Sequence, residues 1–201
     1  MREINPKSFL YEERGPIAFI TFNRPDKLNS LTFEIYRELT RAFAELQDRP
    51  GVRVVVVTGQ GRGFCSGGDV NDIIGELFER DMAGLLEFTR MTCELIRNIR
   101  ALRRPVIASL NGTVAGAGAA IALACDIRIA AETARIAFLF VKVGLAGADM
   151  GAAFLLPKIV GLGKATELLY TGEFISAAEA GSSGLYNRVV PPEELEAETL
   201  R

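Results

Sequence analysis

Two glycine-rich turns are the segments of this sequence whose residue types could perform chemistry. One contains Ser66-Gly67-Gly68-Asp69 and the other contains Gly116-Ala117-Gly118. Glycine lets a backbone amide approach a ligand without an intervening Cβ, and a helix N-terminus adds positive potential there. Two amides directed at one oxygen form an oxyanion hole, which stabilises negative charge on a carbonyl oxygen. The alternative is that both segments are tight turns whose glycines only permit close packing.

The glycine clusters of this sequence do not have the spacing of a nucleotide-binding loop. Gly116-Ala117-Gly118 lacks the third glycine of the dinucleotide-binding fingerprint. Gly163-Lys164 is followed by alanine and has no glycine at the start of a P-loop pattern. The sequence therefore argues against both kinds of phosphate site.

The residue types that are absent restrict the chemistry further. The chain has no histidine, so a Ser-His-Asp relay or a histidine-ligated metal site cannot be built. Its cysteines, Cys65, Cys93 and Cys125, form no C-x-x-C pair, which argues against a zinc ribbon or a disulfide framework. We expect no metal and a reducing compartment, and we expect the cysteines to be structural rather than nucleophilic.

Charge and hydrophobicity indicate a globular protein outside the membrane. Lys and Arg number 23 against 25 Asp and Glu in 201 residues, for a net charge of -2, so no positive excess favours nucleic acid. The N-terminus carries acids and Pro6 before any apolar run, unlike a signal peptide. The longest apolar stretch, Val114 to Cys125, is shorter than the roughly 20 residues that span a bilayer. We expect a cytoplasmic protein.

Strand-like and helical segments alternate along the chain. The predicted strands are Phe9–Glu13, Ile17–Phe22, Val54–Val57, Val106–Leu110, Ile127–Ala131 and Ile136–Phe140. The first predicted helix begins after Thr32. The other predicted helices cover Leu85–Leu102, Ala115–Ala124, Gly151–Val160 and Lys164–Leu169. This alternation of strands and helices predicts a layered α/β fold. Each glycine-rich turn follows a buried strand and precedes a helix. The helix of small apolar residues within Ala115–Ala124 must be buried on all sides.

Several separated motifs, taken in order, resemble the crotonase family of enoyl-CoA hydratases and isomerases. The motifs are Asn23-Arg24-Pro25 with Lys27-Leu28-Asn29, Phe64-Cys65-Ser66-Gly67-Gly68-Asp69, Pro105-Val106-Ile107-Ala108 with Asn111-Gly112, and Cys125-Asp126. The resemblance runs from about Phe9 to Val190. It implies a spiral of ββα units, an acyl-CoA thioester substrate with no separate cofactor, and assembly as a homotrimer or hexamer.

The same resemblance divides the chain and suggests its site residues. Residues 1–190 would form the acyl-CoA-binding core, and residues 191–201 would start a C-terminal helical region whose remainder lies beyond Arg201. The oxyanion-hole amides fall on Gly68 and Ala117. The segments along the CoA path contain Lys27, Leu28, Ser66, Gly67, Asp69 and Val70. For Asp69, a favourable acidic position at a helix start is an equal alternative.

Two departures from the family pattern bear on the reaction. Hydratases of this family use two glutamates to activate water, and those positions correspond to Ala120 and Phe140 here. Neither residue can transfer a proton, so hydration by the usual pair is doubtful. Phe138 and Phe140 suggest a hydrophobic wall for the acyl group.

One acid remains near the expected site. Asp149-Met150-Gly151-Ala152 resembles the segment in which some isomerases of the family carry a catalytic aspartate. An apolar pocket would raise the pKa of Asp149 and suit it to proton transfer. Alternatively, Asp149 caps the helix that begins near Met150. We therefore expect an enoyl-CoA isomerase; the alternatives are a hydratase with an atypical water site and a non-catalytic subunit of the same fold.

Overall fold

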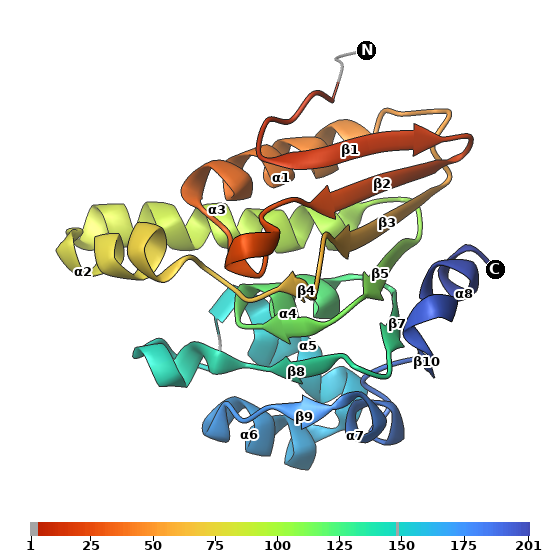
Figure 1. Ribbon diagram of the computed structural model, residues 1–201. Helices are drawn as coiled ribbons and strands as arrows, with labels where there is room; N and C mark the ends of the chain where they lie inside the picture. The colour runs from red at the N-terminus through yellow and green to blue at the C-terminus, as the bar shows by residue number, and fades with distance from the viewer. Residues whose placement is uncertain (1–3, 148) are drawn as a thin grey trace.

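The computed structural model describes residues 4–147 and 149–201 and contains two β-sheets (Figure 1). The larger sheet has the order β1-β2-β3-β5-β7-β10 and the smaller has the order β4-β6-β8-β9. The larger sheet comprises β1 (Phe9–Arg14), β2 (Ile17–Phe22), β3 (Val54–Gly59), β5 (Val106–Leu110), β7 (Ile127–Ala131) and β10 (Arg188–Val190). The smaller comprises β4 (Gly63–Cys65), β6 (Thr113–Ala115), β8 (Arg135–Ala137) and β9 (Ile175–Ser176).

Helices cover and connect these sheets. They are α1 (Phe33–Leu46), α2 (Glu76–Glu79), α3 (Met82–Ala101), α4 (Ala117–Ala124), α5 (Ala152–Val160), α6 (Leu162–Thr171), α7 (Ala177–Ser182) and α8 (Leu195–Leu200). Val70–Gly75 forms a π-helix, and 3-10 helices cover Pro25–Lys27, Leu139–Val143, Asp149–Gly151 and Pro192–Glu194. Within the described residues, no helix combines the length and the apolar character needed to cross a membrane.

The chain alternates between the two sheets. The strands β3, β5 and β7 of the larger sheet are each followed directly by β4, β6 and β8 of the smaller one. Neighbouring strands run parallel from β2 through β3, β5 and β7 to β10, whereas β1 and β2 form the predicted antiparallel hairpin. A helical segment follows each of β4, β6 and β8, so the predicted spiral of ββα units is confirmed.

Helix α4 lies inside the molecule, as its composition requires. All eight of its residues are buried. A Cβ on Gly118 would lie 2.3 Å from the carbonyl oxygen of Cys65, which is closer than any real side chain allows. Helix α4 can therefore pack directly on the β4 backbone because residue 118 is glycine. At its other end the buried guanidinium of Arg128 donates to the carbonyl oxygens of Ala122 and Cys125, at 3.2 and 2.6 Å. These contacts hold α4 at both ends.

Helix α1 has the predicted start, and it packs against α3. The Thr32 side chain accepts a hydrogen bond from the Ile35 amide at the N-terminus of α1. The buried face of α1 meets α3, which crosses the same side of the larger sheet (Figure 1). Helix α3 begins at Met82, three residues before the predicted start, because Asp81 caps it by accepting from the Gly84 amide.

The predicted strand Ile136–Phe140 is wrong in its second half. Strand β8 ends at Ala137, and a 3-10 helix begins at Leu139. The reason is the length of its neighbour: β6 pairs with β8 only as far as Ala115, where its chain turns into α4. Without a strand beside it, the segment after Ala137 coils towards the glycine-rich turns.

Candidate functional site

The two glycine-rich turns lie in contact because they follow neighbouring parallel strands. Strands β4 and β6 are paired, and adjacent strands are about 4.8 Å apart. Gly67 adopts a φ of +104°, a conformation that side-chain-bearing residues rarely adopt. A Cβ at this position would lie 3.2 Å from the Ala115 carbonyl oxygen and 3.4 Å from the Ala117 amide nitrogen. The backbone approach therefore requires glycine at position 67.

The hydrogen bonds around Gly68 determine the direction of its amide. The Leu31 amide donates to the Gly67 carbonyl oxygen, and the Asp69 amide donates to the Leu31 carbonyl oxygen, each at 2.8 Å. Amides of consecutive residues in extended backbone point to opposite sides. The N–H of Gly68 is therefore directed away from the Leu31 segment and remains available to a ligand.

The Ala117 amide is available for a different reason. Ala117 is the first residue of α4, so its N–H has no carbonyl one turn earlier in the helix. The preceding Gly116 adopts a φ of +50°, and its position provides no side-chain cap. The positive end of the α4 dipole adds to the potential at this amide. Gly68 and Ala117 line the same pocket, so both N–H groups are candidates to donate to a single ligand oxygen there.

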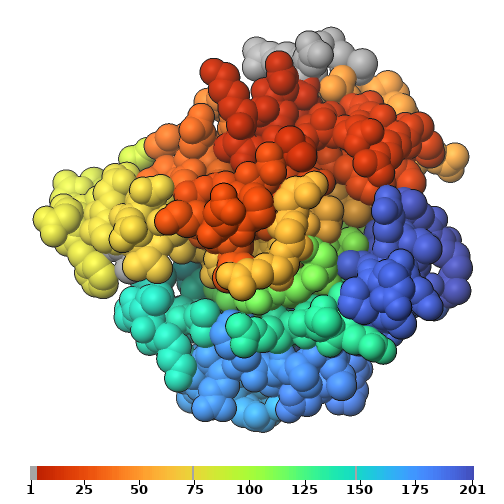
Figure 2. Space-filling model, viewed as in Figure 1, coloured from red at the N-terminus to blue at the C-terminus, as the bar shows by residue number. Residues whose placement is uncertain are grey.

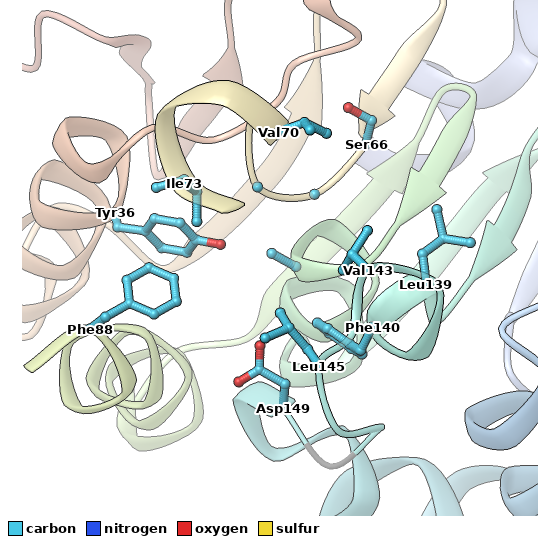
Figure 3. A pocket seen from close by; sticks show the side chains of 14 residues that line it. Tyr36, Ser66, Val70, Ile73, Phe88, Leu139, Phe140, Val143, Leu145 and Asp149 are labelled. Carbon is cyan, nitrogen blue, oxygen red and sulfur yellow. The ribbon is translucent and has the colours of Figure 1, made fainter. Parts of the chain in front are cut away.

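A pocket opens beside the two turns. Figure 3 shows Asp149 on the opposite side of this pocket from Ser66 and Val70, with the Tyr36 hydroxyl pointing into the pocket. Its walls come from both turns, from α1 and α3, and from the segments after β8. The lining residues are Tyr36, Ser66, Gly67, Gly68, Val70, Ile73, Phe88, Gly116, Ala117, Leu139, Phe140, Val143, Leu145 and Asp149.

Asp149 is the only carboxylate among the described lining residues. Burial raises its pKa, although its Oδ1 accepts a hydrogen bond from the Met150 amide at 2.9 Å. The alternative role as helix cap is wrong for α5: the cap position is Gly151, and Met150 between them has a φ of +49°. The carboxylate is thus held in the pocket wall by its own neighbour.

The six residues predicted along the CoA path fall into three groups, of which Asp69 alone is the third. Ser66, Gly67 and Val70 line the pocket. Lys27 and Leu28 form a turn behind Ser66: the Ser66 amide donates to the Leu28 carbonyl oxygen at 3.0 Å, and the Lys27 side chain is exposed. The assignment of these residues to CoA binding stays a prediction.

Asp69 does not line the pocket but stabilises the turn that does. Its Oδ1 accepts from the amides of Asn71 and Asp72, which makes it the N-cap of the π-helix. Its Oδ2 accepts from Arg24 at 3.1 Å and from Ser30 at 3.0 Å. Burial opposes ionisation, but these hydrogen bonds outweigh it and lower the pKa of Asp69. For Asp69, the predicted alternative to a place on the CoA path was an acid at the start of a helix, and this is the position that Asp69 occupies.

Ala120 and Phe140, which the resemblance predicts at the hydratase glutamate positions, differ in their relation to the pocket. Phe140 forms part of the predicted hydrophobic wall, whereas Phe138 is buried outside it. Ala120 lies within α4, fully buried and not part of the described lining. Neither position carries a proton-transferring group.

Six lining residues were not singled out in the sequence. They are Tyr36, Ile73, Phe88, Leu139, Val143 and Leu145. Tyr36 and Phe88 stand on the buried faces of α1 and α3, where they have the pattern of ordinary core residues. No local signal distinguishes them, because only packing between distant segments brings them to the turns. Among the described residues, no group of three or more His, Cys, Asp or Glu could hold a metal ion.

Comparison with known proteins shows the family to which this chain is similar. The family model described as enoyl-CoA hydratase/isomerase matches residues 12–201. A Mycobacterium bovis protein named "Probable enoyl-CoA hydratase echA12" is 39% identical over 187 residues, which are 90% of this chain and 65% of the relative. The chain thus spans about two thirds of that relative's length. The Escherichia coli 1,2-epoxyphenylacetyl-CoA isomerase is 37% identical over 188 residues, with 91% of this chain and 69% of the relative covered.

A solved structure gives the same picture of the fold. The crystal structure of a Streptomyces coelicolor A3(2) protein, provisionally described as an enoyl-CoA hydratase, superposes with a TM-score of 0.96 at 47% identity. The superposition covers 100% of this chain and 73% of that one. The parallel strand pairs, the contacting glycine turns and these similarities lead to one conclusion. The chain belongs to the enoyl-CoA hydratase/isomerase family and has the crotonase fold.

Proposed function

We propose that this protein binds acyl-CoA thioesters and moves a carbon–carbon double bond from the β,γ to the α,β position. The observation that supports this most directly is that Gly68, Ala117 and Asp149 line one pocket. In this proposal the thioester oxygen accepts hydrogen bonds from the two amides. CoA enters as part of the substrate, and no separate cofactor takes part.

The amides of Gly68 and Ala117 stabilise the intermediate in this scheme. Removal of a proton from the α-carbon sends the bonding pair towards the thioester, which becomes an enolate with negative charge on its oxygen. Preorganised donors in a site that excludes water stabilise such a charge strongly. The side chains around the turns, among them Ile73, Phe140 and Leu145, are apolar and cannot hold water by hydrogen bonds.

Asp149 carries the proton in the proposed reaction. Its carboxylate takes the proton from the α-carbon of the β,γ-enoyl thioester and returns it to the γ-carbon. The double bond then lies between the α- and β-carbons, and the carboxylate is regenerated. The raised pKa of Asp149 brings the base closer to neutrality, where proton transfer to and from carbon is more effective.

Hydration is the second candidate reaction, favoured by the name of the mycobacterial relative. Adding water to an enoyl thioester needs groups that orient and deprotonate a water molecule. The described lining contains Asp149 as its single carboxylate, and Ala120 and Phe140 occupy the positions of the usual glutamates. A hydratase would therefore need an atypical water site. A third candidate, a non-catalytic subunit, would keep the thioester pocket without turnover.

One experiment separates the three candidates. The rates of isomerisation of a β,γ-hexenoyl-CoA and of hydration of its α,β-isomer are measured with the same enzyme preparation, from the absorbance of the conjugated thioester. We expect isomerisation to be faster. Faster hydration would support the hydratase. Absence of both reactions, with hexanoyl-CoA still binding in calorimetry, would support the non-catalytic subunit.

The assembly and location of the protein are part of the proposal. We expect a homotrimer or hexamer in the cytoplasm, with neither nucleic acid nor membrane as a partner. Light scattering at micromolar concentration tests the assembly, and a monomer alone would contradict it.

A further inference from the structure

The side chain of Tyr36 has a place in the pocket that the proposed reaction does not explain. Tyr36 is 2% exposed, and its hydroxyl points into the pocket between α1 and α3 (Figure 3). Its hydrogen-bond partner is the Met150 sulfur, at 3.8 Å. A thioether is a weak acceptor, and burying a hydroxyl without a good acceptor carries a free-energy penalty. Among the described residues the hydroxyl therefore lacks a strong partner.

The ring of Tyr36 is held firmly, so the hydroxyl has a fixed direction. Phe88 packs edge-to-face against the ring, with centroids 5.9 Å apart, and Phe33 packs against Phe88 with centroids 5.5 Å apart. The backbone of Tyr36 lies within α1, where its carbonyl oxygen also accepts from the Thr40 hydroxyl. A fixed donor of this kind pairs with a ligand atom without losing much conformational freedom.

The group remains a donor over the physiological pH range. Burial raises the pKa of Tyr36 well above its ordinary value, and the nearby charge of Asp149 acts in the same direction. A hydrocarbon chain in the pocket cannot accept the hydrogen bond. The neighbouring side chains of Ile73, Phe88 and Leu145 are apolar and cannot accept it either.

We propose that Tyr36 selects acyl-CoA thioesters whose acyl group carries an oxygen atom, such as a hydroxyl or a carbonyl, beyond the reacting carbons. This inference rests on the proposed function and adds a substrate class to it. The tyrosine hydroxyl donates a hydrogen bond to that oxygen and thereby positions the acyl group. An oxygen-bearing acyl group supplies a stronger acceptor than the Met150 sulfur, the partner that this hydroxyl has among the described residues.

Binding of saturated thioesters tests this without depending on turnover. Dissociation constants are measured by calorimetry for hexanoyl-CoA and for hexanoyl-CoA hydroxylated on the fifth or the sixth carbon, with wild type and Tyr36→Phe. The preference is the dissociation constant of hexanoyl-CoA divided by that of whichever hydroxylated thioester binds more tightly to wild type. We expect Tyr36→Phe to reduce this preference about threefold to tenfold, the effect of one buried hydrogen bond.

Tyr186→Phe is the matched control. Tyr186 is also 2% exposed, and its hydroxyl has no hydrogen-bond partner among the described residues, but it lies outside the pocket lining. Its replacement should leave the preference unchanged. An equal change in the affinity of both thioesters on Tyr36→Phe, or no change, would overturn the inference and leave the proposed function intact. Failure of wild type to bind any of the thioesters would overturn both.

Discussion

Arg24 and Asp69 form an ion pair, with Nη2 and Oδ2 3.1 Å apart, that joins the first polar turn of the chain to the turn that carries Gly68. Arg24 also donates to the Ser30 carbonyl oxygen at 2.7 Å. The two contacts hold the Leu31 backbone beside Gly67 and Asp69, and this backbone directs the Gly68 amide. The orientation of one proposed oxyanion donor thus depends on a salt bridge outside the pocket.

Asp69→Ala should destabilise the protein and reduce turnover together. Loss of the N-cap contact costs about 1 kcal/mol of unfolding free energy, and the coupling to Arg24 adds about 1 kcal/mol at most. Urea unfolding of Arg24→Gln, Asp69→Ala and the double variant gives this coupling directly. Strictly additive changes in unfolding free energy would show that the pair contributes nothing.

The stabilisation from Asp69 should also depend on pH in a defined direction. Because the folded-state pKa of Asp69 is lowered, its contribution is present above the ordinary aspartate value of about 4 and is lost as the pH falls below it. The difference in melting temperature between wild type and Asp69→Asn should therefore shrink below about pH 4. A difference that grows in acid would contradict the assignment.

Gly68→Pro should abolish most turnover, whereas Gly68→Ala should retain it. Proline removes the amide donor, and loss of one oxyanion donor typically reduces the rate about 100- to 1,000-fold. A Cβ at position 68 lies 3.4 Å from the nearest atoms of Ile73, an ordinary contact, so alanine fits and keeps its N–H. Both variants are compared in isomerisation rate and in melting temperature. Full activity of a folded Gly68→Pro variant would exclude this amide from catalysis.

Asp149→Asn should separate the proton-transfer role from the structural one. Asparagine keeps the oxygen that accepts from the Met150 amide but cannot act as a base, so isomerisation should fall about 100- to 10,000-fold. Stability should rise at neutral pH: burial raises the folded-state pKa of Asp149, so the ionised carboxylate there opposes folding. For wild type, the rate should decline with falling pH at values above the ordinary aspartate pKa. Unchanged isomerisation in the variant would remove Asp149 from the mechanism.

Two glycine-to-alanine changes in helices should have opposite effects on stability. In Gly118→Ala the new Cβ would lie 2.3 Å from the Cys65 carbonyl oxygen, which forces α4 away from β4 and costs about 1–3 kcal/mol. In Gly163→Ala, on α6, no atom of the described residues lies within 4 Å of the new Cβ, and alanine should stabilise the helix by about 0.5–1 kcal/mol. Thermal unfolding measures both, and equal shifts would contradict the packing described for α4.

The predictions from sequence succeeded where local pattern determines structure. The valine run that begins at Val54 has no polar alternation and became a central strand, and the small apolar residues of α4 became a buried helix. Both outcomes follow from which surfaces these side chains must bury. The end of β8 could not be predicted in this way, because it depends on the length of β6.

Site residues were predictable to the extent that they lie on the turns themselves. The two turns were singled out by their glycine content and their position after buried strands, and the resemblance to the crotonase family pointed to Gly68 and Ala117 within them. The structural role of Asp69 stayed open because its partner Arg24 lies 45 residues earlier in the chain. Tyr36 reaches the pocket only because α1 packs beside α3, and a tyrosine on the buried face of a helix has no signature of its own.

The proposed oxyanion donors are backbone groups, and this has a consequence for how such a chain can evolve. Apart from proline, a substitution at Gly68 or Ala117 leaves the N–H in place. The pocket walls proposed to hold the acyl group are instead made of side chains from α1, α3 and the segments after β8. Mutation of the wall residues can therefore change which acyl groups bind, while the two backbone N–H groups proposed to bind the thioester oxygen stay in place. Directed evolution of substrate range in this protein should start from the wall residues and leave both turns untouched.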